Sequence, residues 1–245
     1  MSPIGFGYVK RLTEASRSDA LDMSSKNITQ NRPNRRNSSS AKSQLKLMQA
    51  AEALVGRYGL RGVSARAVAE AAKFKNNTSV QYHFGSLDNL FEHLLRYRMG
   101  EMEPYRQAML NDLGYRPGDR IEPRMAIEVI CIPHLKLRNR KGEFPYATFL
   151  CQYLPERFPG GFDWVMQPSS GSPSVISSLI SEFRKSLSEM PETLFNRRLA
   201  SATLLFLNNL RGIGKIAAQD VSEEFLIQDS LRQAEAAMIA PVLEL

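Results

Sequence analysis

The sequence predicts an all-α protein, and three observations support this. Apolar residues recur at steps of three and four from Ser43 onward, which places them on one face of a helix. Helix-capping residues stand before or after most of these segments. No stretch alternates apolar and polar residues convincingly, as a half-buried strand would. With 245 residues, 43% hydrophobic and 23% charged, the chain is long and apolar enough for a sizeable core.

The amino-terminal part of this pattern consists of three helices followed by a longer fourth one. Their expected bounds are 43–58, 65–72, 78–84 and 87–103. The residues that set these bounds are the N-caps Ser43, Ser64 and Ser86, the left-handed C-terminal caps Gly59 and Gly85, and Pro104, which is expected to stop the fourth helix. The second and third helices are short and joined by a tight turn, which is typical of a helix-turn-helix.

The remaining chain is expected to be helical as well. Its predicted helices span 106–114, 123–138, 145–154, 174–188, 192–219 and 222–240, the second kinked at Pro133. Residues 154–173 are rich in Pro, Gly and Ser and are expected to form a long loop. We therefore predict an amino-terminal three-helix helix-turn-helix domain over 43–104, joined by a long helix to a carboxy-terminal helical bundle over 105–245.

The net charge of +7 is confined to the first part of the chain. Residues 1–104 hold 16 basic and 9 acidic side chains, whereas residues 105–245 hold 16 of each. Most of this excess, 8 basic against 3 acidic, lies in residues 1–44. Residues 1–42 are expected to form a disordered basic arm, in which Met23 is an alternative start. A basic segment of this kind suits a polyanion such as DNA, although it could equally be a solubilising tail.

Several classes of protein are not expected. No apolar run approaches the ~18–20 residues of a membrane span. The apolar patch at residues 4–9 is too brief for a secretory signal. The two cysteines, Cys131 and Cys151, make no disulfide framework. We therefore expect a cytoplasmic protein that does not bind a membrane.

A specific pattern runs through the predicted helix-turn-helix. Its parts are Ala50-Ala51-Glu52 with Tyr58-Gly59, Val63-Ser64 with Val68-Ala69 and Ala72, and Val80-Gln81-Tyr82-His83-Phe84-Gly85-Ser86 with Asp88 and Leu90. Over residues 43–103 this pattern resembles the DNA-binding domain of TetR-family transcriptional regulators. The Asn76-Asn77 pair resembles a subgroup with a longer turn before the recognition helix. Beyond residue 103 only the helical layout is similar.

The expected DNA contacts follow from this pattern and from side-chain chemistry. Gln suits a bidentate contact with adenine, and a Thr methyl suits the thymine C5 methyl. His83 resembles a residue that contacts phosphate or braces the helix, and any one of these side chains could instead simply face solvent. The candidates are Ser64, Arg66, Lys73, Lys75, Asn77, Thr78, Ser79, Gln81, Tyr82 and His83. The family usually has Gly at the position of Lys73 and a cation at that of Leu87. Lys73 and Lys75 are expected to supply the missing charge, together with Arg32, Arg35 and Arg36 from the arm.

The carboxy-terminal half shows no catalytic signature. It contains no nucleophile elbow, phosphate loop, dinucleotide fingerprint or zinc-protease motif, so we expect neither an enzyme nor a cofactor. Cys131 and His134 have the spacing of two metal ligands, with Cys151 or His93 as further candidates. We expect structural cysteines on a buried helix face and no metal.

Two apolar sets in this half are candidate binding surfaces. The resemblance implies an effector pocket, for which we single out Met125, Val129, Ile132, Phe149, Tyr153, Trp164, Ile180 and Phe183. The last two helices carry a predicted dimer face of Phe195, Leu199, Ala202, Phe206, Leu210, Ile227, Leu231, Ala234 and Met238. In both cases the alternative is a plain packed core.

These observations predict a ligand-responsive transcriptional regulator. We expect a homodimeric repressor that binds a near-palindromic operator and is released by a small apolar or aromatic effector. The alternative is a DNA-binding protein that needs no effector or is regulated by a partner protein. A well-packed interior would favour this alternative, whereas an apolar cavity of about 300 Å³ or more would favour an effector.

Overall fold

The computed structural model describes residues 35–157, 174–213 and 221–242. Within these ranges every regular element is a helix and none is a strand, so the predicted all-α class is confirmed. None of the helices in the described ranges has the combination of length and apolar character that crossing a membrane requires.

The first described helix, α2 (Arg35–Tyr58), begins earlier than the expected Ser43. Residues 35–42 contain neither Pro nor Gly, and a helix that is already nucleated gains one hydrogen bond for each residue added. This part of the predicted disordered arm is therefore helical, and residues 1–34 lie outside the described residues. The inner face of α2 carries Leu47, Ala51 and Val55, which are fully buried.

Two short helices, α3 (Ala65–Ala71) and α4 (Ser79–Phe84), follow α2 as predicted. The Ser64 hydroxyl accepts a hydrogen bond from the Ala67 backbone N–H at 3.2 Å, which confirms it as the N-cap of α3. Gly85, with a φ of 77°, ends α4. Ser86 then caps the next helix by accepting from the Asn89 N–H at 3.0 Å.

The turn after α3 is closed by a Schellman motif with Lys73 at its left-handed position. The Phe74 N–H donates to the Ala69 carbonyl at 2.9 Å, and the Lys73 N–H donates to the Glu70 carbonyl at 3.0 Å. Lys73 has a φ of 61° and is the sole non-glycine residue at positive φ in the described ranges. A side chain at this position costs free energy that glycine would not.

The long helix α5 (Leu87–Asp112) passes straight through Pro104, so the predicted stop there is wrong. A proline ring removes one backbone hydrogen bond and presses on the carbonyl four residues earlier. That residue is Gly100, which has no side chain and has open space around it. The predicted helix over 106–114 is the continuation of α5, and the predicted domain boundary falls inside a continuous helix.

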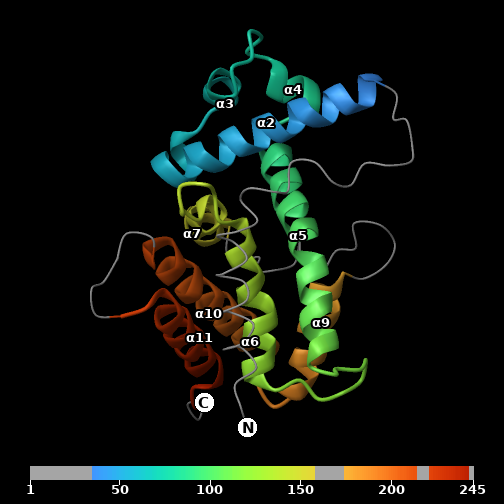
Figure 1. Ribbon diagram of the computed structural model, residues 1–245, viewed down its shortest axis with the longest axis vertical. Coiled ribbons are helices and arrows are strands. Elements are labelled where there is room, and N and C mark those ends of the chain that lie inside the picture. The colour runs from blue at the N-terminus through green and yellow to red at the C-terminus, as the bar shows by residue number, and fades with distance from the viewer. Residues whose placement is uncertain (1–34, 158–173, 214–220, 243–245) are drawn as a thin grey trace.

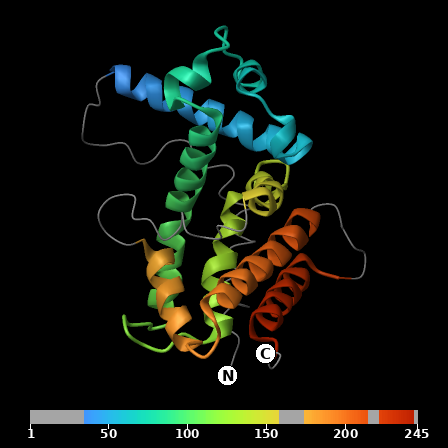
Figure 2. The same ribbon diagram turned by 180° about the vertical axis from the view of Figure 1, so that it is seen from behind.

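The remaining helices lie below α2 in the view of Figure 1, with α7 packed directly against α2. They are α6 (Pro123–Cys131), the 3-10 helix η3 (Ile132–Leu137), α7 (Pro145–Arg157), α9 (Val175–Ser186), α10 (Glu192–Ile213) and α11 (Glu223–Ile239). The change from α6 to η3 at Ile132 gives the break expected at Pro133. Figures 1 and 2 both place α6 between α9 on one side and the α10–α11 pair on the other.

The apolar faces of α10 and α11 are buried inside the single chain. The predicted dimer residues Phe195, Leu199, Ala202, Phe206, Leu210, Ile227, Leu231, Ala234 and Met238 are each at most 1% exposed. The two helices bury these stripes against each other and against α6 and α7. The predicted dimer face is therefore wrong in its residues, and the alternative of a packed core applies to all nine.

A buried ion pair joins α2 to α5. Arg98 Nε and Nη2 donate to the two carboxylate oxygens of Glu52 at 3.0 and 2.6 Å, and Nη1 donates to Glu101 at 2.8 Å. The Glu52 side chain is 3% exposed. One turn further along the same side of α2, Gly56 faces Thr148 of α7, and a Cβ at position 56 would lie 3.1 Å from the Thr148 methyl group. Two contacts therefore fix α2 against the helices below it.

The left-handed conformation of Lys73 predicts that Lys73→Gly stabilises the protein. We expect the free energy of unfolding in urea to rise by about 1 kcal/mol, because the Cβ penalty at positive φ disappears. Gly114 holds the same position in the motif that ends α5, with a φ of 65°. Gly114→Ala should therefore lower the free energy of unfolding by a similar amount. A Lys73→Gly variant no more stable than the wild type would contradict this reading of the turn.

Candidate nucleic-acid interface and internal cavity

The predicted DNA-contacting residues belong to α3, α4, the turn between them and the residue before α3, at the end of the molecule at the top of Figure 1, and most of them are exposed. The exposed members are Ser64, Arg66, Lys73, Lys75, Asn77, Thr78, Gln81 and Tyr82. Tyr82 is 84% exposed, which is high for an aromatic side chain. On the opposite face of α4, Val80 is fully buried and Phe84 nearly so. The short helix therefore presents a polar outer face on an apolar base.

Ser79 does not belong to this surface, and its predicted contact role is wrong. It is 7% exposed, and its hydroxyl donates to the Asn76 carbonyl at 2.6 Å. The Asn76 side chain in turn accepts from the Thr78 N–H at 2.9 Å and from the Thr78 hydroxyl at 2.7 Å. Asn76 thus organises the turn, a role that its Asn-x-Thr spacing could have indicated. The Thr78 methyl is left as the group available for an apolar contact.

His83 braces α4 from the side. Its half-buried ring meets Tyr82 edge-on, with centroids 4.9 Å apart, and meets Phe74 at 6.4 Å. Of the two roles left open for His83, these contacts support bracing. Arg66 forms an exposed pair with Glu70 at 2.8 Å, which is weak enough for a phosphate to replace.

A basic groove of about 650 Å³ lies between α2 and the turn after α3. Lys42 and Lys46 line it from α2, and Lys73 lines it from the turn. Lys42 and Lys46 stand one helical turn apart and are both exposed, a spacing that could have indicated a common face. Leu87, where a cation was expected, is half-buried and packs on the core as the first residue of α5. The groove supplies positive charge that position 87 lacks.

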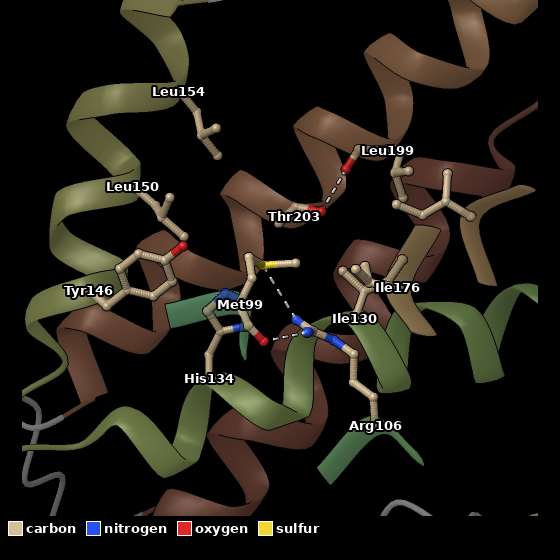
Figure 3. A pocket seen from close by; sticks show the side chains of 11 residues that line it. Met99, Arg106, Ile130, His134, Tyr146, Leu150, Leu154, Ile176, Leu199 and Thr203 are labelled. Carbon is tan, nitrogen blue, oxygen red and sulfur yellow. Dashed lines mark hydrogen bonds between the residues drawn. The ribbon is translucent and has the colours of Figure 1, made fainter. Parts of the chain in front are cut away.

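A small internal cavity of about 40 Å³ lies among α5, α6, η3, α7, α9 and α10 (Figure 3). Of the predicted pocket residues, Ile180 lines it. Val129, Ile132, Phe149, Tyr153 and Phe183 are buried elsewhere in the core, Met125 is half-buried outside the cavity, and Trp164 lies outside the described residues. Position 130 of α6 faces the cavity rather than position 129, because one residue turns a helix by about 100°. The apolar pattern therefore identified one lining residue of this cavity, Ile180, and missed the others.

Four polar side chains line this cavity, and one of them, Thr203 of α10, donates its hydroxyl hydrogen to the Leu199 carbonyl at 2.8 Å. Arg106 of α5 and Tyr146 of α7 are each 1% exposed, and His134 of η3 is 5% exposed. Burial, and then the positive charge of Arg106, lower the pKa of His134 to about 3. Its Nδ1 lies 3.1 Å from the Cys131 carbonyl, so Nδ1 carries the proton and donates it there. Burial also raises the pKa of the Tyr146 hydroxyl, which therefore stays protonated.

Comparison with protein-family models and with curated proteins finds no match to this chain. Across the ranges that the structure describes, no three His, Cys, Asp or Glu side chains are grouped in a way that could hold a metal ion. The chemistry of the two sites must therefore be argued from their own residues.

The buried, neutral His134 predicts a loss of stability at mildly acidic pH. The unfolded chain takes up the histidine proton near pH 6.5, whereas the folded protein takes it up only near pH 3. Between these values the unfolded state binds more protons, so the free energy of unfolding falls as the pH decreases. We expect this residue to cost about 2 kcal/mol at pH 5 relative to pH 7.5 or above.

His134→Asn provides the comparison, because its amide N–H can still donate to the Cys131 carbonyl but does not titrate. Urea unfolding at pH 7.5 and pH 5 should show a smaller loss of stability in this variant than in the wild type. Equal losses in the two proteins would exclude His134 as the source.

Proposed function

We propose that this protein is a transcriptional regulator of the TetR type that binds DNA in a sequence-specific manner. The single observation that carries the proposal is the division of α4 into two faces. Val80 and Phe84 anchor the helix in the core, while Gln81 and Tyr82 stand out from the surface beside the Thr78 methyl. An α-helix with its side chains is about 10–12 Å across, so a helix such as α4 fits into a major groove about 12 Å wide.

Positive charge flanks this helix in the way that DNA binding requires. Lys73 and Lys75 stand in the turn before it, and Lys42 and Lys46 stand beside the turn on α2. Contacts of such side chains with phosphates position a protein on DNA, while groups on the recognition helix read the bases. In this assignment Gln81 and Thr78 are the base-reading residues, and the lysines contact the backbone.

A near-palindromic operator requires a homodimer, and the proposed contact surface is the outer face of α10 and α11. The inner faces are already used in the core, as described above. On the outer side of α11, Phe225 is 59% exposed and Ile239 is 49% exposed. A two-fold axis through this surface would pair the two α4 helices, which must lie about 34–36 Å apart to enter successive major grooves on one side of the DNA.

Two helices connect the cavity to the proposed DNA-binding end and support a regulatory role for it. Met99 and Arg106 of α5 line the cavity, and α5 begins next to α4. Helix α7, which carries Tyr146 and Leu150, ends in two ion pairs with the amino-terminal helices: Glu156 with Arg61, and Arg157 with Asp88. A ligand that favours one position of α5 or α7 would change the placement of α4.

The small volume of the cavity argues against a large effector and favours a second candidate function. About 40 Å³ is far below the ~300 Å³ of a typical ligand site. A DNA-binding protein that needs no effector, or one regulated by a partner protein, is therefore the alternative to a regulator with a small ligand.

Selection of bound duplexes from a random DNA pool tests the function directly. We expect enrichment of a near-palindromic site by the full chain at physiological salt. Recovery of DNA without any sequence preference would contradict a regulator that reads its operator.

Gln81→Ala should lower affinity for the selected site by about 1–3 kcal/mol and relax the preference at one base pair in each half-site. Repeating the selection with the variant and titrating both sites measures this effect. Gln107→Ala, an exposed glutamine on α5 away from α4, is the matched control and should leave the selected sequence unchanged. An equal loss of affinity for all sequences would make Gln81 a backbone contact.

The basic groove predicts a change in salt dependence. Replacing both Lys42 and Lys46 by Gln should weaken DNA binding across all sequences and reduce the slope of log affinity against log salt by about 2. The control replaces Arg116 and Arg120 by Gln, which removes two charges at the opposite end of α5 and should leave the slope unchanged. An unchanged slope in the lysine variant would place the groove outside the interface.

A further inference from the structure

The internal cavity contains two buried polar atoms that have no hydrogen-bond partner: Nε of Arg106 and the hydroxyl oxygen of Tyr146. Both side chains are 1% exposed, and both line the cavity. An unpaired buried polar group costs about 1–3 kcal/mol, so such groups normally meet a partner. The other polar lining residues, His134 and Thr203, are bonded to backbone carbonyls, so the two unpaired atoms indicate where the polar group of a ligand belongs.

The free side of the Arg106 guanidinium has the shape of a carboxylate receptor. Nη1 is used, donating to Glu103 at 3.1 Å and facing the Met99 carbonyl at 3.5 Å. Nη2 faces only thioether sulfurs, Met99 at 3.9 Å and Met102 at 3.7 Å, which are weak acceptors. Nε and Nη2 form one edge of the guanidinium, and this edge holds two parallel donors that match the two oxygens of a carboxylate. Figure 3 shows this group beside Met99, with Tyr146 across the cavity.

The positive charge of Arg106 is only partly compensated by its neighbours. Glu103 is shared, because its second oxygen accepts from the Val175 N–H at 2.7 Å, at the first residue of α9. Burial lowers the pKa of Arg106, which shows that its surroundings compensate its charge only in part. The neighbouring His134 is neutral near pH 7, because its pKa is about 3. A carboxylate on the Nε–Nη2 edge would add the missing compensation.

The dimensions of the cavity restrict the ligand to a small one. A space of about 40 Å³ holds little more than one water molecule with its ~30 Å³ share of liquid volume. It fits the carboxylate head, and a short apolar body needs further room between Leu150, Leu154 and Ile176. Met99 can provide this room, because a half-buried, unbranched side chain with a weak hold on Nη2 rotates at little cost.

We propose that this cavity binds a short-chain monocarboxylate, whose carboxylate pairs with the Nε–Nη2 edge of Arg106 and accepts a hydrogen bond from Tyr146. The ligand displaces the Met99 thioether and places its apolar body against the leucines of α7 and the isoleucines of α9. The role of this ligand as an effector rests on the proposed function. Its binding to the cavity does not depend on that function.

Isothermal titration of the full chain with butyrate tests the site without DNA. We expect saturable binding of butyrate and at least about tenfold weaker binding of butyramide, which has the same shape but no charge. Butyramide that binds as tightly as butyrate would overturn the assignment. A dry or water-filled cavity that binds no monocarboxylate from acetate to hexanoate would overturn it as well.

Substitutions at Arg106, Tyr146 and Glu103 test whether butyrate binds to the proposed groups. Tyr146→Phe removes one hydroxyl and should weaken butyrate about 2- to 10-fold, and Arg106→Met should weaken it about 10- to 100-fold. Glu103→Gln should instead tighten butyrate by about threefold or more, because a competing negative charge is removed. A purely structural role of Arg106 would not produce this opposite response. Butyrate affinity that is unaffected by Tyr146→Phe and Glu103→Gln would overturn the proposal even if Arg106→Met fails to fold.

Matched controls come from the same helices outside the cavity. Tyr153→Phe removes a buried hydroxyl from α7, and Arg184→Met removes a half-buried guanidinium from α9. Both should leave butyrate affinity within about twofold of the wild type, since neither residue lines the cavity.

DNA titrations with and without butyrate test the proposed function separately from the carboxylate site. If the protein binds butyrate but not DNA, the carboxylate site is supported and the proposed regulator is contradicted. If it binds DNA but no carboxylate, the regulator is supported and the carboxylate site is contradicted.

Discussion

The ion pair between Glu52 and Arg98 fixes the geometry on which both candidate sites depend. It joins α2, the base of the amino-terminal helices, to the middle of α5, and it does so through two hydrogen bonds of 3.0 and 2.6 Å. Burial acts to lower the pKa of Arg98, but the bonds and charge of Glu52 outweigh it and raise the pKa, so the arginine stays charged. A bidentate pair permits one relative orientation of its two helices, and loss of either partner would leave a buried charge uncompensated.

Because of this connection, α5 serves both ends of the molecule. Its first residue follows Gly85 and Ser86 directly, so the start of α5 is joined to the end of α4. Arg106 lines the cavity about five helical turns further along α5. The helix can do this only because it continues through Pro104. An end at Pro104, as the sequence suggested, would have separated the two sites mechanically. Helix α7 makes a second connection, because its Glu156 and Arg157 pair with Arg61 and Asp88 near the DNA-contacting candidates. Both α5 and α7 therefore run from the cavity to the amino-terminal helices.

Local features were predictable from the sequence, and features that depend on packing partners were not. The caps at Ser64 and Ser86 follow from a side chain and a backbone N–H three residues apart, so the sequence contains the whole interaction. The stop at Pro104 failed because residues on both sides of it, Met102 and Arg106 among them, are buried by tertiary packing, which the local sequence does not show. The apolar stripes of α10 and α11 were read as a dimer face because periodicity reveals a buried face but not what buries it. Arg106 was missed because nothing local marks a charged residue as buried.

The cavity volume restricts the proposed ligand to a small one, and the position of Met99 decides how much room its apolar body would have. Met99 lies in the middle of the lining residues, between Tyr146 of α7 on one side and the guanidinium of Arg106 on the other (Figure 3). The guanidinium is held from one side by Glu103, whereas the Met99 thioether is held to it by a 3.9 Å contact alone. A thioether is a weaker acceptor than a carboxylate, so the proposed ligand would gain a stronger hydrogen bond on Nη2, set against the cost of desolvating its charge. The 40 Å³ cavity is bounded on this side by Met99, a side chain without a strong hydrogen bond, whereas Glu103 holds the guanidinium behind it.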